Sequence, residues 1–415
     1  MMACERLDFA DFVRRKVEST RSQIHQIDCV DFPYEAPQEA LASLREAFDS
    51  YVRVFDEALL DGDDDQITAA CKTVNYKIVE YHPILGFLLR ATNIRNSFEA
   101  YDPLRELAHA LLDHKPGVIL SSEWDFSPFT YPAISDDLPD FVFIGLPASE
   151  AGNALILPLA GHELGHSIWG PGGVGEKLKS SINKTVFSSY LSDPRLFESI
   201  FRCECTEDTL LNDPTALSNL TLACGIAGRQ CEEVFCDVIG VRLFAEAFIH
   251  SFEYLIVPSL GGDRSELYPP LQTRLQYMVK AAESFNQPLD DRHAPPLLER
   301  KRMLPAREQF AVRMADTASI ELFPSVLTSA KEYCQGRPVA EVSPDIVAFI
   351  ETAFYNYTPA ENARCFGNII SAAWKVYKHF DNFASEIEDR KEAFEILNNL
   401  SYKSLEVLEY ETKVG

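Results

Sequence analysis

The segment His162-Glu163-Leu164-Gly165-His166 contains two histidines four residues apart, with a glutamate directly after the first of them. On a helix, residues four apart share one face, so both imidazoles can bind the same metal ion. Glu163 lies beside them and can accept a proton from a water molecule that the ion binds. The pattern therefore predicts a Zn²⁺ site equipped with a general base.

A catalytic zinc ion needs three protein ligands and one open position for water. A later helix-forming segment carries Glu233 and Asp237, which are again four residues apart. We predict that Glu233 is the third zinc ligand. Asp237 is predicted to accept a hydrogen bond from the free ring nitrogen of His162 and so fix its orientation. The neighbouring Glu232 shares its helix face with Cys236 and apolar residues, and we interpret it as a packing residue.

Hydrophobic patterning indicates the elements that must position these side chains. Apolar residues repeat at helical steps between Leu41 and Phe55, and residues 1 to about 115 are predicted to be mostly helical. Short β-type runs follow at 118–120 and 141–144. The apolar segment 154–169 carries the two histidines. Pro158 is expected either near the start of that helix or at a kink in it, because a proline inside a helix breaks its hydrogen bonds.

Beyond the histidines the chain again has a helical pattern. Helices are predicted near 208–226 and from about 229 to 254, and the part after Pro288 is helical with a charged tail. The sequence therefore predicts an α+β fold that is predominantly helical. We expect a helical N-terminal region, a central core that carries the chemistry and a helical C-terminal region, with the bounds 1–115, 116–285 and 286–415.

The HExxH motif with a downstream Glu-x-x-x-Asp on a second helix resembles the gluzincin metallopeptidases, a branch of the zincins. The resemblance implies a zincin-like core with a small sheet and an active-site helix, and a peptide or protein substrate. The run Phe141 to Pro147 is similar to the edge strand of that family, which pairs with an extended peptide. Phe143, Ile144 and Gly145 are therefore expected to contact the substrate.

The segment from Tyr268 to Leu275 is similar to the His-Pro-x-x-x-x-Arg-Ile/Leu segment of the CAAX-prenyl endopeptidase-like gluzincins. The family's histidine helps to stabilise the tetrahedral intermediate, and its arginine organises the segment. This chain departs from the pattern in having Tyr268 at the histidine position. A phenol can donate a hydrogen bond to an oxyanion, so Tyr268 is either a catalytic helper or a packed structural residue. We interpret Arg274 as a partner in a structural salt bridge.

Composition excludes several other functions. The 415 residues carry a formal net charge of −25, which disfavours nucleic acid and anionic membranes as partners. The N-terminus lacks the apolar core of a secretory signal, and no apolar stretch is long enough to span a membrane. The ten cysteines include no CxxC pair. We therefore predict a cytoplasmic protein with reduced thiols, and make no prediction of its oligomeric state.

Two alternatives to a peptidase remain open at this point. The first is a scaffold or regulatory protein that binds zinc but turns over slowly or not at all, which the departure at Tyr268 favours. The second is a zinc hydrolase that acts on a substrate other than a peptide, which a deep closed pocket would favour. The glycine-rich run from Gly170 to Lys177 does not fit a phosphate-binding loop, because its lysine is one position late and a helix precedes it.

Overall fold

In the computed structural model of the chain, the described residues are 2–91, 98–124, 137–259, 264–287, 289, 293, 299 and 303–414. The structure is predominantly helical, and its described part contains a single sheet of two strands. The predicted α+β class with mostly helical content is confirmed at this level. Within the described ranges, no helix is both long and apolar enough to cross a membrane.

The chain divides into two compact units. Unit 1 consists of residues 1–98, 114–125 and 129–151, and unit 2 of residues 99–113, 126–128 and 152–415. The sequence-based division places its boundaries at 115/116 and 285/286, where the hydrophobic pattern of the sequence changes. The compact units instead join segments that are distant in sequence: the two strands belong with the N-terminal helices, and the histidine segment belongs with the C-terminal helices.

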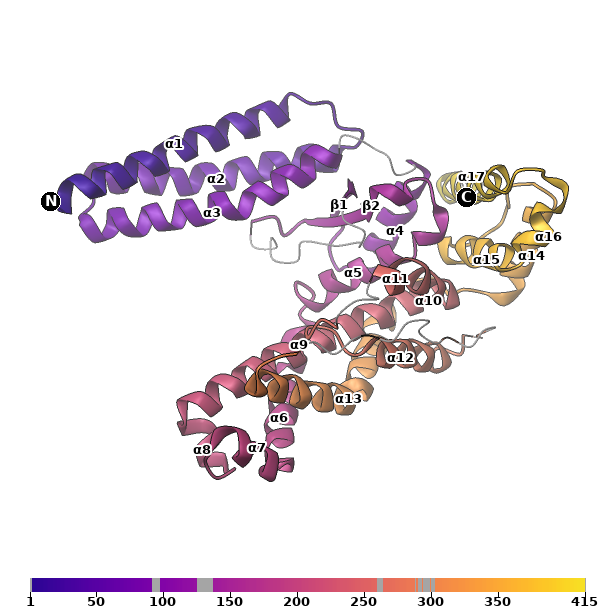
Figure 1. Ribbon diagram of the computed structural model, residues 1–415. Helices are drawn as coiled ribbons and strands as arrows, with labels where there is room; N and C mark the ends of the chain where they lie inside the picture. Colours follow the sequence, from indigo (N-terminus) through magenta and orange to yellow (C-terminus); the bar gives the residue numbers. More distant parts are fainter. Residues whose placement is uncertain are drawn as a thin grey trace. The chain divides into compact units, whose positions relative to one another are not determined.

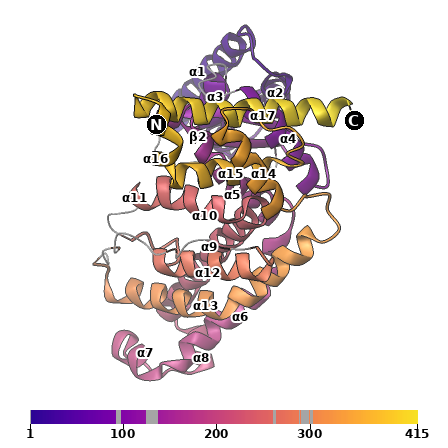
Figure 2. The ribbon, with the colours of Figure 1, turned by 90° about the vertical axis from the view of Figure 1, so that its right-hand side faces the viewer.

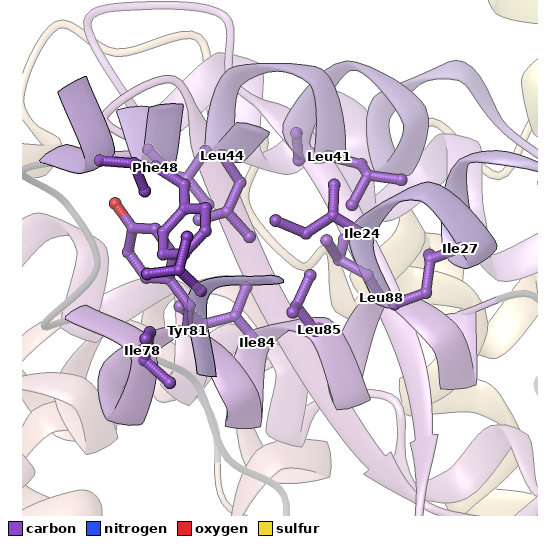
Figure 3. Packing of buried hydrophobic residues seen from close by; sticks show 14 of the residues in the cluster. Ile24, Ile27, Leu41, Leu44, Phe48, Ile78, Tyr81, Ile84, Leu85 and Leu88 are labelled. Carbon is purple, nitrogen blue, oxygen red and sulfur yellow. The ribbon is translucent and has the colours of Figure 1, made fainter. Parts of the chain in front are cut away.

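Unit 1 is built on three long helices that run side by side in Figure 1: α1 (Met2–Asp28), α2 (Glu35–Asp61) and α3 (Asp64–Ala91). Each helix contributes buried apolar side chains to a shared core. Figure 3 shows Ile24 of α1, Phe48 of α2 and Leu85 of α3 among the side chains that meet there. The apolar repeat between Leu41 and Phe55 thus faces this core, as its helical spacing predicts.

The sheet of unit 1 consists of β1 (Gly117–Glu123) and β2 (Phe141–Pro147). The strands are parallel, with Gly117 opposite Phe141, and β1 packs on α2 and α3. Both strands that the sequence predicted are therefore present. A short 3-10 turn, η3 (Ala148–Glu150), follows β2.

The remaining described helices belong mainly to unit 2. They are η1 (Phe98–Ala100), α4 (Tyr101–Leu111), η4 (Ala154–Ile156), α5 (Leu159–Trp169), α6 (Val174–Ser192), α7 (Pro194–Phe201), α8 (Glu207–Asn212), α9 (Pro214–Phe244), α10 (Glu246–Ser251), the π-helical turn η5 (Phe252–Ile256), α11 (Val257–Ser259), α12 (Leu271–Ser284), α13 (Ala306–Cys334), α14 (Pro344–Tyr355), α15 (Phe366–Lys378), α16 (Phe380–Phe383), η6 (Ala384–Glu386) and α17 (Arg390–Val414).

Helix α9 is the centre of unit 2. It packs against α5, α6, α8, α12 and α13, and Figure 2 shows α12 and α13 running close to it. The C-terminal helices form a second group, in which α15 packs against both α14 and α17. Pro158 directly precedes α5, so its predicted position at the start of the histidine helix is confirmed.

The sequence prediction was wrong about one long element. It placed one helix near 208–226 and another from 229 to 254, whereas α9 runs without a break from Pro214 to Phe244. Glycines at 225 and 228 do not interrupt it, because a helix tolerates an isolated glycine when packing elsewhere supplies stability. The helix ends instead at Ala245, whose positive φ of 51° takes the backbone out of the right-handed helical region.

Candidate metal centre

Helices α5 and α9 pack with their backbones unusually close together. A Cβ added at Gly165 would lie 2.7 Å from the Cα of Cys236, and one added at Gly161 would lie 3.1 Å from the ring of Phe244. These two glycines are four residues apart and so line one face of α5. The x-x positions of HExxH thus include Gly165, whose missing side chain lets the histidine helix approach α9.

This packing yields a stability prediction. In Gly165→Ala the new methyl group would meet the backbone of α9, which cannot rotate away, and we expect a loss of about 1–3 kcal/mol in the free energy of unfolding. Gly225→Ala is the matched control, because it lies on α9 with no atom within 4 Å of the added Cβ. The control should be neutral or more stable. Urea denaturation of both variants tests this, and equal stability of the two would contradict it.

Each histidine of α5 has its Nδ1 atom bonded to a carboxylate of α9. His162 Nδ1 lies 2.9 Å from Asp237 Oδ1, and His166 Nδ1 lies 2.8 Å from Glu232 Oε1. An ionised carboxylate can only accept, so Nδ1 must donate in both contacts. In the neutral imidazole this leaves the lone pair on Nε2, which is the atom that a metal ion would bind.

The two Nε2 atoms face the same carboxylate. Glu233 Oε2 lies 3.3 Å from His162 Nε2, and Glu233 Oε1 lies 3.9 Å from His166 Nε2. The ring centroids of the histidines are 5.0 Å apart. Glu233 is only 2% exposed and His166 only 4% exposed, so the three groups meet inside the protein. Two imidazole nitrogens and one carboxylate form the donor set typical of a catalytic zinc site.

Two arginines neutralise the carboxylates of this centre. Arg229 lies 2.8 Å from an oxygen of Glu232 and 2.8 Å from Glu233 Oε1. Arg274 donates two hydrogen bonds of 2.8 Å to Asp237. The structural salt bridge predicted for Arg274 is therefore present, and its partner is the carboxylate that also holds His162.

Sequence reasoning missed two members of this network. Glu232 is the partner of His166, although its helix face had suggested packing, and Arg229 was not considered. The pair of histidines could have indicated the role of Glu232. Each ring needs its own hydrogen-bond acceptor, and Asp237 serves only one of them. Arg229 stands three and four residues before the two glutamates, which is the helical spacing for ion pairs.

The charges of the centre shift the pKa values of its members. Burial alone would raise the pKa of Glu233, but His162, Arg274 and His166 lower it to about 2. Burial alone would lower the pKa of His162, but Asp237 and Glu233 raise it to about 10. Without a metal ion, His162 therefore holds a proton on Nε2. A metal ion must displace that proton, so its affinity should increase with pH.

Glu163 and Tyr268 flank this donor set. Glu163 is 3% exposed, and burial raises the pKa of its carboxyl group, which suits an acceptor that works near neutral pH. The guanidinium of Arg274 lies over the ring of Tyr268, 5.3 Å from its centroid. The charge of Glu233, followed by burial, raises the pKa of Tyr268, so its hydroxyl keeps its proton.

Cys236 is an alternative to Glu233 as a third ligand. Its sulfur lies within 4.8 Å of ring nitrogens of His162 and His166. The thiol is fully buried, and burial raises its pKa well above the usual value. The carboxylate of Glu233 faces both Nε2 atoms, at 3.3 and 3.9 Å, and two imidazoles with one carboxylate match the donor set of a catalytic zinc site, so we assign Glu233 as the third ligand of the proposed site.

The role of Glu232 can be tested directly. If its carboxylate fixes the tautomer of His166, Glu232→Ala should weaken Zn²⁺ binding by about 10–100-fold. Glu232→Gln should weaken it less, because the amide oxygen can still accept from Nδ1. Competition with a chromophoric chelator gives the affinities, and Glu308→Ala, at an exposed position of α13, is the control. Unchanged affinity in Glu232→Ala would show that the contact does not orient the histidine.

The residues expected to contact a substrate strand lie in the other unit. Phe143, Ile144 and Gly145 are all on β2 of unit 1 and are all buried, whereas the histidines belong to unit 2. Phe143 packs in the core of the three long helices, where it meets Phe87. The side chain of Phe143 is therefore part of the hydrophobic core. The role of β2 in substrate binding stays a prediction.

A groove within unit 2 reaches the edge of the centre. It has a volume of about 920 Å³ and lies mainly between α6 and α9. Its lining includes apolar side chains such as Trp169 and Phe187, and it also includes Arg229 and Glu232. A ligand in this groove would contact Glu232, which is bonded to His166, and Arg229, which is paired with Glu233.

Comparisons of the chain with models of known protein families, with curated proteins and with solved structures gave no match.

Proposed function

We propose that the protein is a zinc-dependent hydrolase, a metallopeptidase with a zincin-like core, in which His162, His166 and Glu233 hold the ion. The observation that carries this proposal is the orientation of the two imidazoles. Both rings give Nδ1 to carboxylates of α9, and each Nε2 faces one oxygen of the buried Glu233. Glu233 therefore lies against both Nε2 atoms, as a third ligand shared with two imidazoles would.

The donor set fits Zn²⁺ better than the other common divalent ions. Mg²⁺ and Ca²⁺ prefer oxygen ligands, whereas two imidazoles with one carboxylate suit zinc. When bound, Zn²⁺ supplies Lewis acidity and lowers the pKa of water at the site. Asp237 and Glu232 hold the ligating tautomers, and Arg229 and Arg274 pair with the neighbouring carboxylates and hold them in position.

Glu163 is the proposed general base and acid. One of its carboxylate oxygens accepts the proton of the attacking water and then donates it to the leaving amine nitrogen, so the side chain ends each cycle ionised. Its burial supports this role, because burial raises the pKa of the carboxyl group and so makes the carboxylate a stronger base. The protonated hydroxyl of Tyr268 is the proposed donor to the oxyanion that forms on the substrate.

The groove between α6 and α9 supports a substrate with apolar side chains. Phe187 and Trp169 line it, and Arg229 at its edge can pair with a carboxylate or a backbone carbonyl of the ligand. A peptide is therefore the proposed substrate class.

The experiment is a hydrolysis assay on a broad peptide library, read by mass spectrometry, with zinc-loaded protein and with the same protein after treatment with a chelator. We expect cleavage that the chelator abolishes and that added Zn²⁺ restores. Cleavage that persists in full without metal would overturn the proposal, because it would assign the activity to a contaminant or to another site.

Two observations favour a second candidate, a zinc-binding protein without turnover. Glu233 already makes a 2.8 Å ion pair with Arg229, and the chain has Tyr268 where the similar peptidases have histidine. A library without any cleaved peptide, measured on protein that holds zinc at His162 and His166, would support this candidate. Its function would then lie in partner binding by the helical regions.

A further inference from the structure

A second cluster of histidines and glutamates lies in unit 2, away from the centre described above. Glu246 and His250 stand four residues apart on α10 and share its face. Glu253 follows in the π-helical turn η5, a rare conformation that occurs often at functional sites. His293 completes the cluster from a part of the chain 40 residues further on, counted from Glu253.

His293 bridges the two glutamates. Its Nε2 lies 2.9 Å from Glu246 Oε1, and its Nδ1 lies 2.9 Å from Glu253 Oε2. The ring centroids of His250 and His293 are 5.0 Å apart. The Nε2 atom of His250 lies 3.9 Å from Glu246 Oε2. The side chain of His293 is 1% exposed, whereas those of His250, Glu246 and Glu253 are 11%, 12% and 23% exposed, so the cluster is only partly open to solvent.

A neutral imidazole cannot satisfy two carboxylates, because it has only one N–H group. If both carboxylates are ionised, either His293 carries a second proton, or a cation takes the place of one of its N–H groups. Burial lowers the pKa of His293, but Glu246 and Glu253 raise it to about 9, so a proton can occupy this position. A metal ion competes for the same place, as it does at other sites built from histidine and carboxylate.

The geometry suits a transition metal. Ligand atoms of Glu246, His250 and His293 all lie within 4.8 Å of one another. In a tetrahedral zinc site with bonds of about 2.0–2.1 Å, ligand atoms are separated by roughly 3.4 Å, so side-chain shifts of about 1 Å would bring these three onto one ion. Glu253 would then accept from His293 Nδ1, as Asp237 does from His162 in the first centre.

The surroundings leave room for a fourth ligand. A cavity of about 50 Å³ adjoins Glu246 and His250, which is enough for a water molecule. The ring of Trp374 packs 5.2 Å from that of His250 and limits its movement. Lys375 also lines the cavity. Imidazole ligands favour zinc and related transition metals.

We propose that Glu246, His250 and His293 form a second metal site that binds Zn²⁺, with Glu253 orienting His293. The ion joins α10 to the part of the chain that carries His293. This proposal is independent of the hydrolase function proposed above.

The test counts ions in a chain that lacks the first centre. In the His162→Ala/His166→Ala double variant, equilibrium dialysis against Zn²⁺ should leave one ion per chain. Adding His293→Gln or Glu246→Gln should remove that ion, and His379→Gln, at an exposed position outside both clusters, should not. A thermal shift on adding Zn²⁺ should likewise be present in the double variant and lost with His293→Gln.

Two results would overturn the proposal. One is a double variant that is folded by circular dichroism and binds no zinc, which would mean that the cluster holds a proton instead of a metal. The other is an ion that remains when both His293→Gln and Glu246→Gln are introduced, which would locate it elsewhere. Neither result depends on hydrolytic activity, so this proposal can fail while the hydrolase proposal stands.

Discussion

Replacing Glu163 by glutamine is expected to reduce peptide hydrolysis by about 10²–10⁴-fold while zinc remains bound. Glutamine has nearly the same shape but cannot accept the proton of the attacking water. The metal ligands should stay in position, because each histidine is oriented by a carboxylate of α9 rather than by Glu163. The loss should therefore appear in kcat and in kcat/KM alike, as expected for an interaction made in the transition state.

Two measurements make this result specific. Glu308→Gln removes a charge of the same kind from an exposed position of α13 and should retain full activity. Zinc content, measured on the same samples, separates a lost base from a lost ion. If Glu163→Gln retains both its zinc and the wild-type rate, then Glu163 is not the base and the mechanism is wrong.

The second large effect concerns the third ligand. The free energy of Zn²⁺ binding to structural sites with four ligands is about 10–16 kcal/mol. One ligand therefore contributes roughly 3 kcal/mol, and its loss should weaken binding by more than about 100-fold. We expect a loss of this size in Glu233→Gln, whose amide lacks the charge that faces both Nε2 atoms. Cys236→Ala should bind zinc as the wild type does.

Cobalt substitution gives an independent readout of the same question. Co²⁺ bound to a thiolate has an intense near-ultraviolet charge-transfer band, whereas Co²⁺ bound to imidazole and carboxylate has only weak visible bands. We expect the wild type to lack the intense band. If the band is present and Cys236→Ala removes it, the third ligand is Cys236 and the assignment of Glu233 is contradicted.

The sequence was most informative where spacing on a single helix decides the geometry. The four-residue spacing of His162 and His166 requires a shared helix face, and Asp237 lies against His162 as its spacing from Glu233 suggested. Helix periodicity depends only on local backbone geometry, so a short motif is enough to predict it.

Contacts between distant segments could not be predicted in the same way. Whether Glu232 packs or binds a histidine depends on how α5 crosses α9, and the close approach at Gly165 determines that crossing. The cluster around His293 has the same origin, because its members lie on segments with no common local pattern. Tertiary packing likewise groups the two strands with the N-terminal helices. The hydrophobic pattern along the sequence does not predict this grouping.

The central claim is that His162 and His166 jointly hold one metal ion, and the zinc content of the purified chain tests it most directly. Wild type and the His162→Ala/His166→Ala double variant would be loaded with Zn²⁺, dialysed against the same buffer and measured by atomic emission. We expect one zinc ion fewer per chain in the double variant, whatever other sites the protein has. Equal zinc content in two folded proteins would contradict it.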